Sequence, residues 1–136
     1  MLTKINSILQ FSFFKQCEFK ISGEGKNIYL TFDDGPVPEV TPIVLDLLDE
    51  YDAKATFFCV GDNIRKHLDI YNEIIKRGHK VGNHTFHHIK GWNTKDEDYY
   101  ADIQAANDLI HSNLFRPPYG RITPKQHYHL KKDYRI

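Results

Sequence analysis

The chain has 136 residues, the length of one domain, and its 18 basic residues balance 18 acidic ones to a net charge of zero. Hydrophobic residues make up 40% of the chain, which is enough for a buried core. The balanced charge argues against a nucleic-acid surface, because such a surface requires clustered Lys and Arg. The two cysteines, Cys17 and Cys59, make no disulfide framework, and Cys59 is interpreted as a small buried hydrophobe within an apolar run.

Residues 1–26 are interpreted as an N-terminal extension to a domain that covers residues 27–136. Polar residues break the apolar stretch of this extension, and no A-x-A-like cleavage site follows it. No stretch of the chain has the ~20 apolar residues that span a bilayer. We therefore expect no transmembrane segment and no convincing signal peptide, which leaves the localisation open between the cytoplasm and the cell envelope.

From residue 27 onward, short apolar runs alternate with segments of helical periodicity. The expected strands are residues 27–32, 55–61, 79–84, 114–120 and 133–136. The expected helices begin at Thr41, at Asp62 or Asn63, at Thr94 and at Thr123. Pro42 and Pro124 support two of these starts, and the Thr94–Glu97 spacing predicts a capping box at a third. This alternation predicts an α/β domain with a mostly parallel sheet of about five strands.

Apolar residues at helical spacing predict which helix faces are buried. The second helix is expected to run without a break to its stop signal, Gly78. The predicted inward residues are Val44, Leu47, Leu48 and Tyr51 in the first helix, Ile64, Leu68, Tyr71 and Ile75 in the second, and Ile103, Ala106 and Ile110 in the third.

Polar clusters follow three of the expected strands. They are residues 31–36 (TFDDGP), 83–88 (NHTFHH) and 116–120 (RPPYG). In α/β folds, functional sites gather at the carboxyl ends of the strands, so the shared position of these clusters predicts a site there.

The Asp33–Asp34 pair has two interpretations. Alone, an Asp-Gly-containing segment is typical of a solvated turn, because Gly supplies unusual backbone angles. Two buried carboxylates cannot both be ionised cheaply, but a cation would reverse that balance. It would fix one carboxylate as a ligand and keep the other anionic, as a general base needs to be.

His84 and His88 are four residues apart, so on a helical turn they would share a face while His87 points elsewhere. This spacing is typical of divalent-metal ligands, and surface histidines in a polar loop are the alternative. One carboxylate and two imidazoles leave coordination positions open for water and substrate, which suits hydrolysis.

Arg116 precedes two prolines that stiffen its loop, so its guanidinium is suited to orient a carboxylate bidentately. An ordinary surface Arg is the alternative interpretation. The backbone N–H at Tyr119–Gly120 follows, and it is a candidate donor to a developing oxyanion.

Two other site classes place similar residues together. A phospho-receiver domain has an acidic pair after its first strand, but it also needs a third Asp and a downstream Lys and gives His84 and His88 no role. An iron oxygenase uses two His and one carboxylate, but usually in an all-β barrel, which the strand–helix alternation opposes.

In order and spacing, TFDDGP, HTFHH and RPPYG resemble the first three motifs of the polysaccharide deacetylase family, the nodulation-deacetylase-like carbohydrate esterase family 4. The resemblance runs from about residue 28 to the end of the chain. It implies a distorted (β/α) barrel and a metal-dependent hydrolase. Such an enzyme removes acetyl groups from N-acetylglucosamine units of chitin-like or peptidoglycan polymers, or from O-acetylated xylan.

The resemblance also implies a role for each matching residue. The implied ligands of one divalent ion, Zn²⁺ first and Co²⁺ or Ni²⁺ as alternatives, are Asp34, His84 and His88. Asp33 would be the general base for the attacking water, and Arg116 would hold and tune Asp33. The backbone amide of Tyr119 would stabilise the tetrahedral oxyanion.

Two further family motifs are absent from the sequence: an Asp/Trp segment and the Leu-x-His that supplies the general acid. His127 and His129 do not fit Leu-x-His and are predicted to be surface residues. The family barrel needs about seven or eight strands, so we expect an incomplete barrel, truncated before its last motifs. The alternative to a deacetylase is an inactive remnant of the same family that binds a metal or a sugar.

Overall fold

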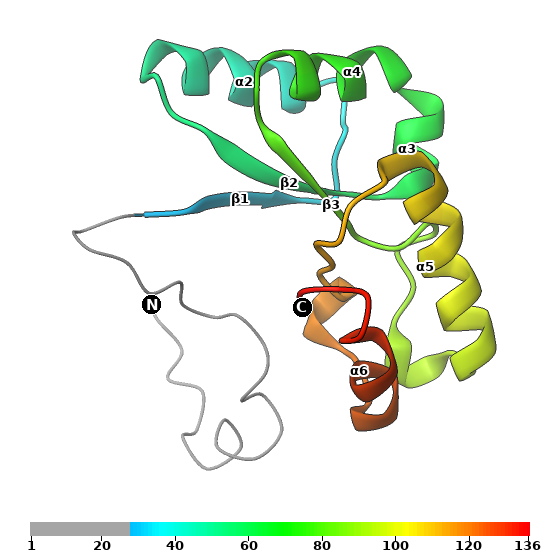
Figure 1. The fold of residues 1–136 in the computed structure, drawn as a ribbon. Coiled ribbons are helices and arrows are strands. Elements are labelled where there is room, and N and C mark those ends of the chain that lie inside the picture. Colours follow the sequence, from blue (N-terminus) through cyan, green and yellow to red (C-terminus); the bar gives the residue numbers. More distant parts are fainter. Residues whose placement is uncertain (1–27) are drawn as a thin grey trace.

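The computed structural model describes residues 28–136, and a parallel sheet lies at the centre of this part of the chain (Figure 1). Its three strands are β1 (Leu30–Asp33), β2 (Ala55–Cys59) and β3 (Lys80–Asn83), in the order β1-β2-β3. Asp33 lies beside Phe58, and Cys59 lies beside Asn83, so the carboxyl ends of all three strands share one edge. The first three predicted strands are confirmed, each shorter than expected.

The sheet is narrower than the five strands expected. Residues 114–120 and 133–136 contribute only single parallel bridges, Asn83 with Phe115 and Leu114 with Arg135. Pro117 and Pro118 come two and three residues after Phe115, which forms the first of these bridges. A proline has no N–H to donate to a strand ladder. The α/β class and the parallel pairing are confirmed, but the fourth and fifth segments are too short to count as strands.

The described residues form five helices between and after the strands. They are α2 (Thr41–Glu50), α3 (Gly61–Lys66), α4 (Leu68–Lys76), α5 (Asp96–Ile110) and α6 (Pro124–Leu130). The expected unbroken second helix is wrong, because the chain leaves the helical conformation at His67 (φ −134°, ψ 52°) and divides into α3 and α4. This break rotates α4, so Tyr71 and Ile74 are buried while Leu68 and Ile75 are exposed.

The first and third helices differ in how well their patterns predict burial. In α2, Leu45 and Leu48 are buried, whereas Leu47 and Tyr51, predicted to face inward, are exposed. In α5 all three predicted residues, Ile103, Ala106 and Ile110, are buried.

Capping also differs from the prediction. Thr94 does not cap α5, because its Oγ1 donates to the carbonyl of Lys90 (2.8 Å) and the helix begins after Lys95. At α6, Thr123 is the N-cap as expected, and a capping box with Gln126 completes it.

Two hydrophobic clusters hold these elements together. In Figure 1, α2 and α4 run along one side of the sheet and α5 lies beside β3. The first cluster joins β2 to four helices through Phe57, Leu45, Ile64, Ile74 and Ile110. The second joins α5, the segment at residue 115 and α6 through Tyr99, Ile103, Phe115, Ile122 and Leu130. Cys59 is a buried free thiol, as predicted, and burial raises its pKa to about 12.

The prediction of two surface histidines in α6 is half wrong. His127 is buried, and burial holds the pKa of its imidazole below the usual value. His129 is exposed, and its ring stacks on that of Tyr100 with the ring centroids 4.2 Å apart. The short polar sequence around His127 gives no sign of the second cluster against which α6 packs.

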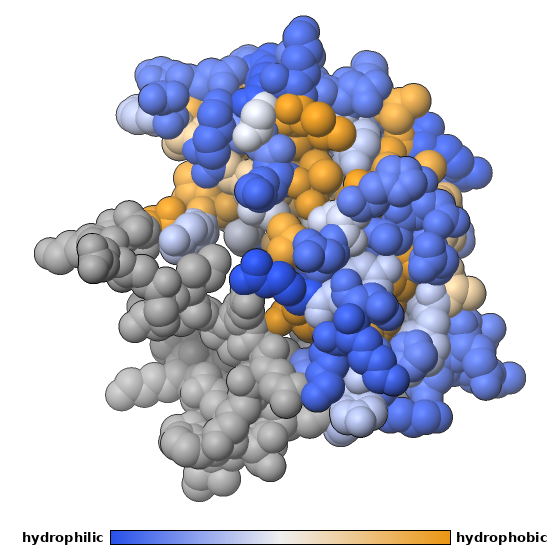
Figure 2. Space-filling view, in the orientation of Figure 1, coloured by the Kyte–Doolittle hydropathy of each residue, from blue (hydrophilic) through white to orange (hydrophobic). Residues whose placement is uncertain are grey.

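The face shown in Figure 2 is mostly hydrophilic, with apolar groups visible where β1 begins. Ile28 and Leu30 contribute to this exposed apolar surface. None of the helices within residues 28–136 combines the length and apolar character that a membrane crossing demands. The predictions for residues 1–26 and Cys17 lie outside the described residues.

Candidate metal centre

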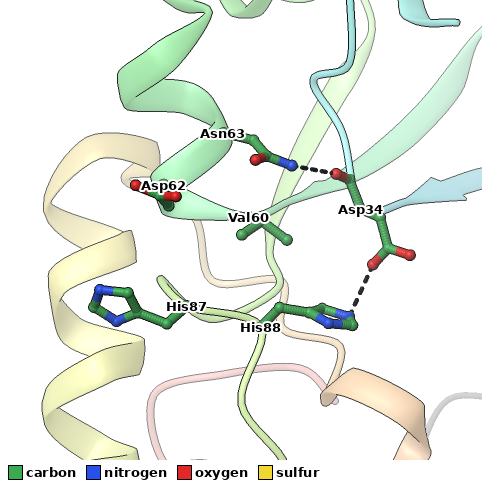
Figure 3. Close-up of a pocket in the computed structure, with 6 residues that line it drawn as sticks. All are labelled: Asp34, Val60, Asp62, Asn63, His87 and His88. Carbon is green, nitrogen blue, oxygen red and sulfur yellow. Dashed lines mark hydrogen bonds and ion pairs between the residues drawn. The ribbon is translucent and has the colours of Figure 1, made fainter.

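The three side chains predicted as metal ligands converge beyond the carboxyl ends of β1 and β3. The Oδ1 atom of Asp34 lies 3.3 Å from Nε2 of His84 and 2.9 Å from Nε2 of His88. One ligand atom from each residue lies within 4.8 Å of the other two. Figure 3 shows Asp34 and His88 pointing toward one another. Two imidazole nitrogens and a carboxylate oxygen are a donor set that suits Zn²⁺ and related divalent ions.

The two histidines meet through a loop and not through the predicted helical turn. Thr85 (φ 64°) and His88 (φ 55°) both have left-handed backbone conformations. The Asn83 side chain accepts from Thr85 N–H (2.8 Å) and donates to the Ile103 carbonyl (2.8 Å), which ties the start of this loop to α5. These turns still bring both rings to one side. The pair predicted from helical spacing therefore converges, although the backbone between the two residues is not helical.

His84 is oriented by its second ring nitrogen. The ring is buried, and Nδ1 lies 2.6 Å from the backbone carbonyl of Arg116. Since a carbonyl only accepts, Nδ1 carries the proton and donates it there, which leaves the Nε2 lone pair facing Asp34. Burial lowers the pKa of His84, against the opposing effect of the carbonyl, and so favours the neutral imidazole that a metal ligand requires.

Asp33 and Asp34 point to different partners, although they are neighbours. Asp34 has a left-handed backbone (φ 69°), and its carbonyl accepts from the Asn63 side chain (2.7 Å). Asp33 instead lies with its Oδ1 2.7 Å from Nη1 of Arg116. The two carboxylates therefore point to different partners, and the Arg116 guanidinium offsets the charge of Asp33. Both effects relieve the repulsion expected of an adjacent acidic pair.

Arg116 reaches Asp33 through a single nitrogen and not bidentately as predicted. Its Nη1 donates to Asp33 and also to Oγ1 of Thr31 (2.9 Å). The guanidinium carbon lies 4.1 Å from the centroid of the Phe58 ring, a cation–π distance. Three partners hold the guanidinium beside Asp33, which supports the interpretation that Arg116 orients this carboxylate.

Tyr119 lies in a short 3-10 turn, Pro118–Gly120, with a left-handed backbone (φ 59°). Its N–H has no hydrogen-bond acceptor within residues 28–136, while the neighbouring N–H of Gly120 donates to the Pro117 carbonyl. The Tyr119 ring lies 4.8 Å from the His88 ring, measured between centroids. The ring contact places Tyr119 beside the candidate ligand His88, and its N–H remains a candidate donor.

A pocket of about 310 Å³ opens beside two of the candidate ligands, Asp34 and His88 (Figure 3). Its walls are formed by Asp34, Val60, Asp62, Asn63, His87 and His88. Sequence reasoning assigned Asn63 only as a possible helix cap and gave Asn83 no role. The one sequence signal for a role of Asn83 was its position directly before His84. No spacing in the sequence connects Asn63 with Asp34.

A family model described as polysaccharide deacetylase matches residues 20–133. The chain belongs to the polysaccharide deacetylase family. The candidate site, part of which Figure 3 shows, therefore lies within a polysaccharide deacetylase domain. The resemblance of the three sequence motifs to this family is confirmed.

Named relatives of this chain include a peptidoglycan-N-acetylglucosamine deacetylase of Bacillus cereus, 39% identical over 76% of this chain and 51% of that protein. A chitooligosaccharide deacetylase of Azorhizobium caulinodans is 36% identical over 74% of this chain and 51% of that protein. The chain spans about half the length of these curated relatives.

Solved structures agree with this assignment. Peptidoglycan deacetylase PdaC from Bacillus subtilis superposes with a TM-score of 0.77 at 32% identity, covering 85% of this chain and 60% of that one. A Bacillus anthracis pseudoenzyme of carbohydrate esterase family 4 superposes with a TM-score of 0.71 at 25% identity, covering 79% and 42%. The polysaccharide deacetylase fold thus occurs in named deacetylases and in a protein described as a pseudoenzyme.

Proposed function

We propose that this chain carries the metal-binding and base-bearing part of a deacetylase that hydrolyses N-acetyl groups on a polysaccharide or oligosaccharide. The observation that supports this most strongly is the convergence of Asp34, His84 and His88 beside the Asp33–Arg116 pair. The names of the bacterial relatives favour peptidoglycan or chitin-like oligosaccharides as the substrate class.

The proposed metal ligands are Oδ1 of Asp34 and Nε2 of both histidines. Zn²⁺ fits this donor set first, and Co²⁺ or Ni²⁺ can replace it because they accept the same nitrogen and oxygen ligands. When bound, such an ion supplies Lewis acidity to the acetyl carbonyl and increases the acidity of water. Asp34 is more exposed than the histidines, so the site is open toward the pocket.

The protein's own groups would perform the proton transfer. The Asp33 carboxylate takes the proton of the attacking water, and Arg116 holds that carboxylate in place with a 2.7 Å hydrogen bond. As the carbonyl oxygen of the acetyl group becomes negative, the N–H of Tyr119 donates to it. The C–N bond then breaks, and the leaving nitrogen takes up the proton held by Asp33 or one from water, so the products are acetate and a free amine on the sugar.

An exposed aromatic surface next to the site suits a sugar chain. Tyr119 and Trp92 are each 60% exposed. Their loops run together, since Gly91 N–H donates to the Arg121 carbonyl (3.0 Å) and the Trp92 indole donates to the Ile122 carbonyl (2.9 Å). Apolar sugar faces pack on such rings, so this surface supports a glycan substrate.

A second candidate function is binding without turnover. It is favoured by the likeness to a pseudoenzyme of the same family. Loss of a general acid would cost such a protein about 10²–10⁴-fold in rate. Esters have better leaving groups than amides, so we expect a smaller relative loss on O-acetyl than on N-acetyl substrates.

Acetate release from N-acetyl-chitooligosaccharides and peptidoglycan fragments, with Zn²⁺ or Co²⁺ added, tests the proposal. We expect Asp33→Asn to lower kcat by about 10² or more while the metal still binds, because only the base is lost. Asp34→Asn removes the charged ligand and should weaken metal binding itself. Glu97→Gln, an exposed change on α5, is the matched control and should retain activity. Saturating metal binding without acetate release would favour the binding remnant.

A further inference from the structure

One carboxylate of α5 holds the loop that carries both candidate imidazoles. The side chain of Asp102 is only 9% exposed. Its Oδ2 accepts from the backbone N–H groups of Phe86 (2.8 Å) and His87 (3.0 Å), and its Oδ1 lies 2.5 Å from Nδ1 of His87. These contacts account for the direction of His87, which points away from Asp34 in Figure 3.

The anchored amides lie between the two predicted ligands. Phe86 and His87 separate the left-handed residues Thr85 and His88, so their position influences where the His88 imidazole lies relative to that of His84. Left-handed conformations cost free energy in residues other than Gly and persist only where surrounding contacts impose them. A largely buried carboxylate that accepts three hydrogen bonds supplies such contacts, and charge-assisted bonds of this kind are stronger than neutral ones.

The opposite side of the same loop is held by α3. Thr85 and Phe86 present their carbonyls to the N–H groups of Gly61 (3.0 Å) and Asp62 (2.9 Å) at the first turn of that helix. The loop is therefore clamped between donors on α3 and one acceptor on α5. Within residues 28–136, Asp102 is the acceptor for both loop amides.

We propose that Asp102 is a positioning residue of the metal centre, which sets the separation of the His84 and His88 nitrogens through the two backbone amides. This inference rests on the proposed metal site and not on deacetylation. Partners that orient metal ligands typically contribute 10- to 100-fold in metal affinity. Asp102 itself touches neither ligand ring, so it would act only through the loop.

Co²⁺ titration of the purified chain tests the proposal, because the d–d absorption of Co²⁺ reports both affinity and coordination geometry. We expect Asp102→Asn to raise the Kd for Co²⁺ about 10- to 100-fold and to alter the spectrum. Asp102→Glu keeps the acceptor and should restore part of the affinity. The matched control is Asp98→Asn, an exposed acid on the same helix. His87→Ala keeps both amides and should have a smaller effect than Asp102→Asn.

Several results would overturn the proposal. They are an unchanged Kd and spectrum in Asp102→Asn, equal losses in His87→Ala and Asp102→Asn, or no Co²⁺ binding by the wild-type chain. If Asp102→Asn does not fold, amide exchange in the wild-type protein decides. The Phe86 and His87 amides should then exchange slowly, and rapid exchange at both would contradict the anchor. Metal binding without acetate release would leave this inference standing and reject only the deacetylation.

Discussion

Arg116 serves two members of the site with different atoms. Its guanidinium holds Asp33, whereas its backbone carbonyl accepts from Nδ1 of His84 and its backbone N–H donates to the Asn83 carbonyl (2.9 Å). A substitution changes the first contact and leaves the two backbone contacts in place. Side-chain variants can therefore separate control of the proposed base from control of the metal ligand.

We expect Arg116→Met to lower kcat/KM for deacetylation by about 10²-fold, because a small displacement of a catalytic group is enough for such a loss. Arg116→Lys, which keeps the charge but loses the planar guanidinium, should recover only part of it. The Kd for Co²⁺ should stay close to the wild-type value in both variants. A large loss of metal affinity would show that the guanidinium also fixes the carbonyl that orients His84.

His79 should make folding stability depend on pH. Its ring is buried, and Nδ1 accepts from the N–H of Ala55 at 3.4 Å. Burial, with Lys54 nearby, lowers the pKa of His79 below 6.5. The unfolded chain then binds the proton first as the pH falls. This contribution to stability is complete above pH 6.5 and is lost as the pH falls toward the folded pKa.

Urea unfolding between pH 7.5 and 5 measures this effect. We expect His79→Asn to weaken the pH dependence of the unfolding free energy, since Oδ1 of Asn can accept from Ala55 without titrating. The control is His111→Asn, at an exposed position with a left-handed backbone that Asn tolerates. An identical pH profile for wild type and His79→Asn would reject the assignment.

The start of α3 contacts the loop of residues 84–88 that carries both candidate imidazoles. Gly61 lies there without a side chain, and an added Cβ would lie 2.4 Å from Cδ2 and 3.1 Å from Cα of Phe86. The second contact is with backbone, so a rotation of the Phe86 ring alone would not relieve it. The position of α3 and the course of the loop therefore depend on each other.

We expect Gly61→Ala to lower the unfolding free energy by about 1–3 kcal/mol, the usual cost of overpacking. Because Phe86 lies between the two imidazoles, Co²⁺ affinity should fall as well. Gly35→Ala serves as the control for stability, since a Cβ there meets only Oγ1 of Thr41 at 3.6 Å. Equal stability of Gly61→Ala and wild type, measured by urea unfolding, would contradict the close contact.

Across the described residues, sequence patterns predicted the features that depend on neighbouring residues in the chain. Apolar runs located β1, β2 and β3, and the polar clusters after β1, after β3 and after the segment at residue 115 contained all six candidate site residues. The break at His67 was not predictable, because no Pro or Gly marks it and it depends on how α3 and α4 pack. The burial of His127 and the Asp102 contact likewise depend on elements distant in sequence.

The order β1-β2-β3 places the proposed ligands of one ion just after the two outer strands of this sheet, with β2 between them. Asp34 can meet His84 and His88 only after both strand pairings have formed, and such long-range closure is slow. An ion that recognises the finished site should leave the refolding rate unchanged and slow unfolding. At 100 times its Kd it would add about 2.7 kcal/mol of stability, or about 100-fold in unfolding rate. Stopped-flow measurements with and without Zn²⁺ would show whether the ion lengthens the lifetime of the folded protein in this way.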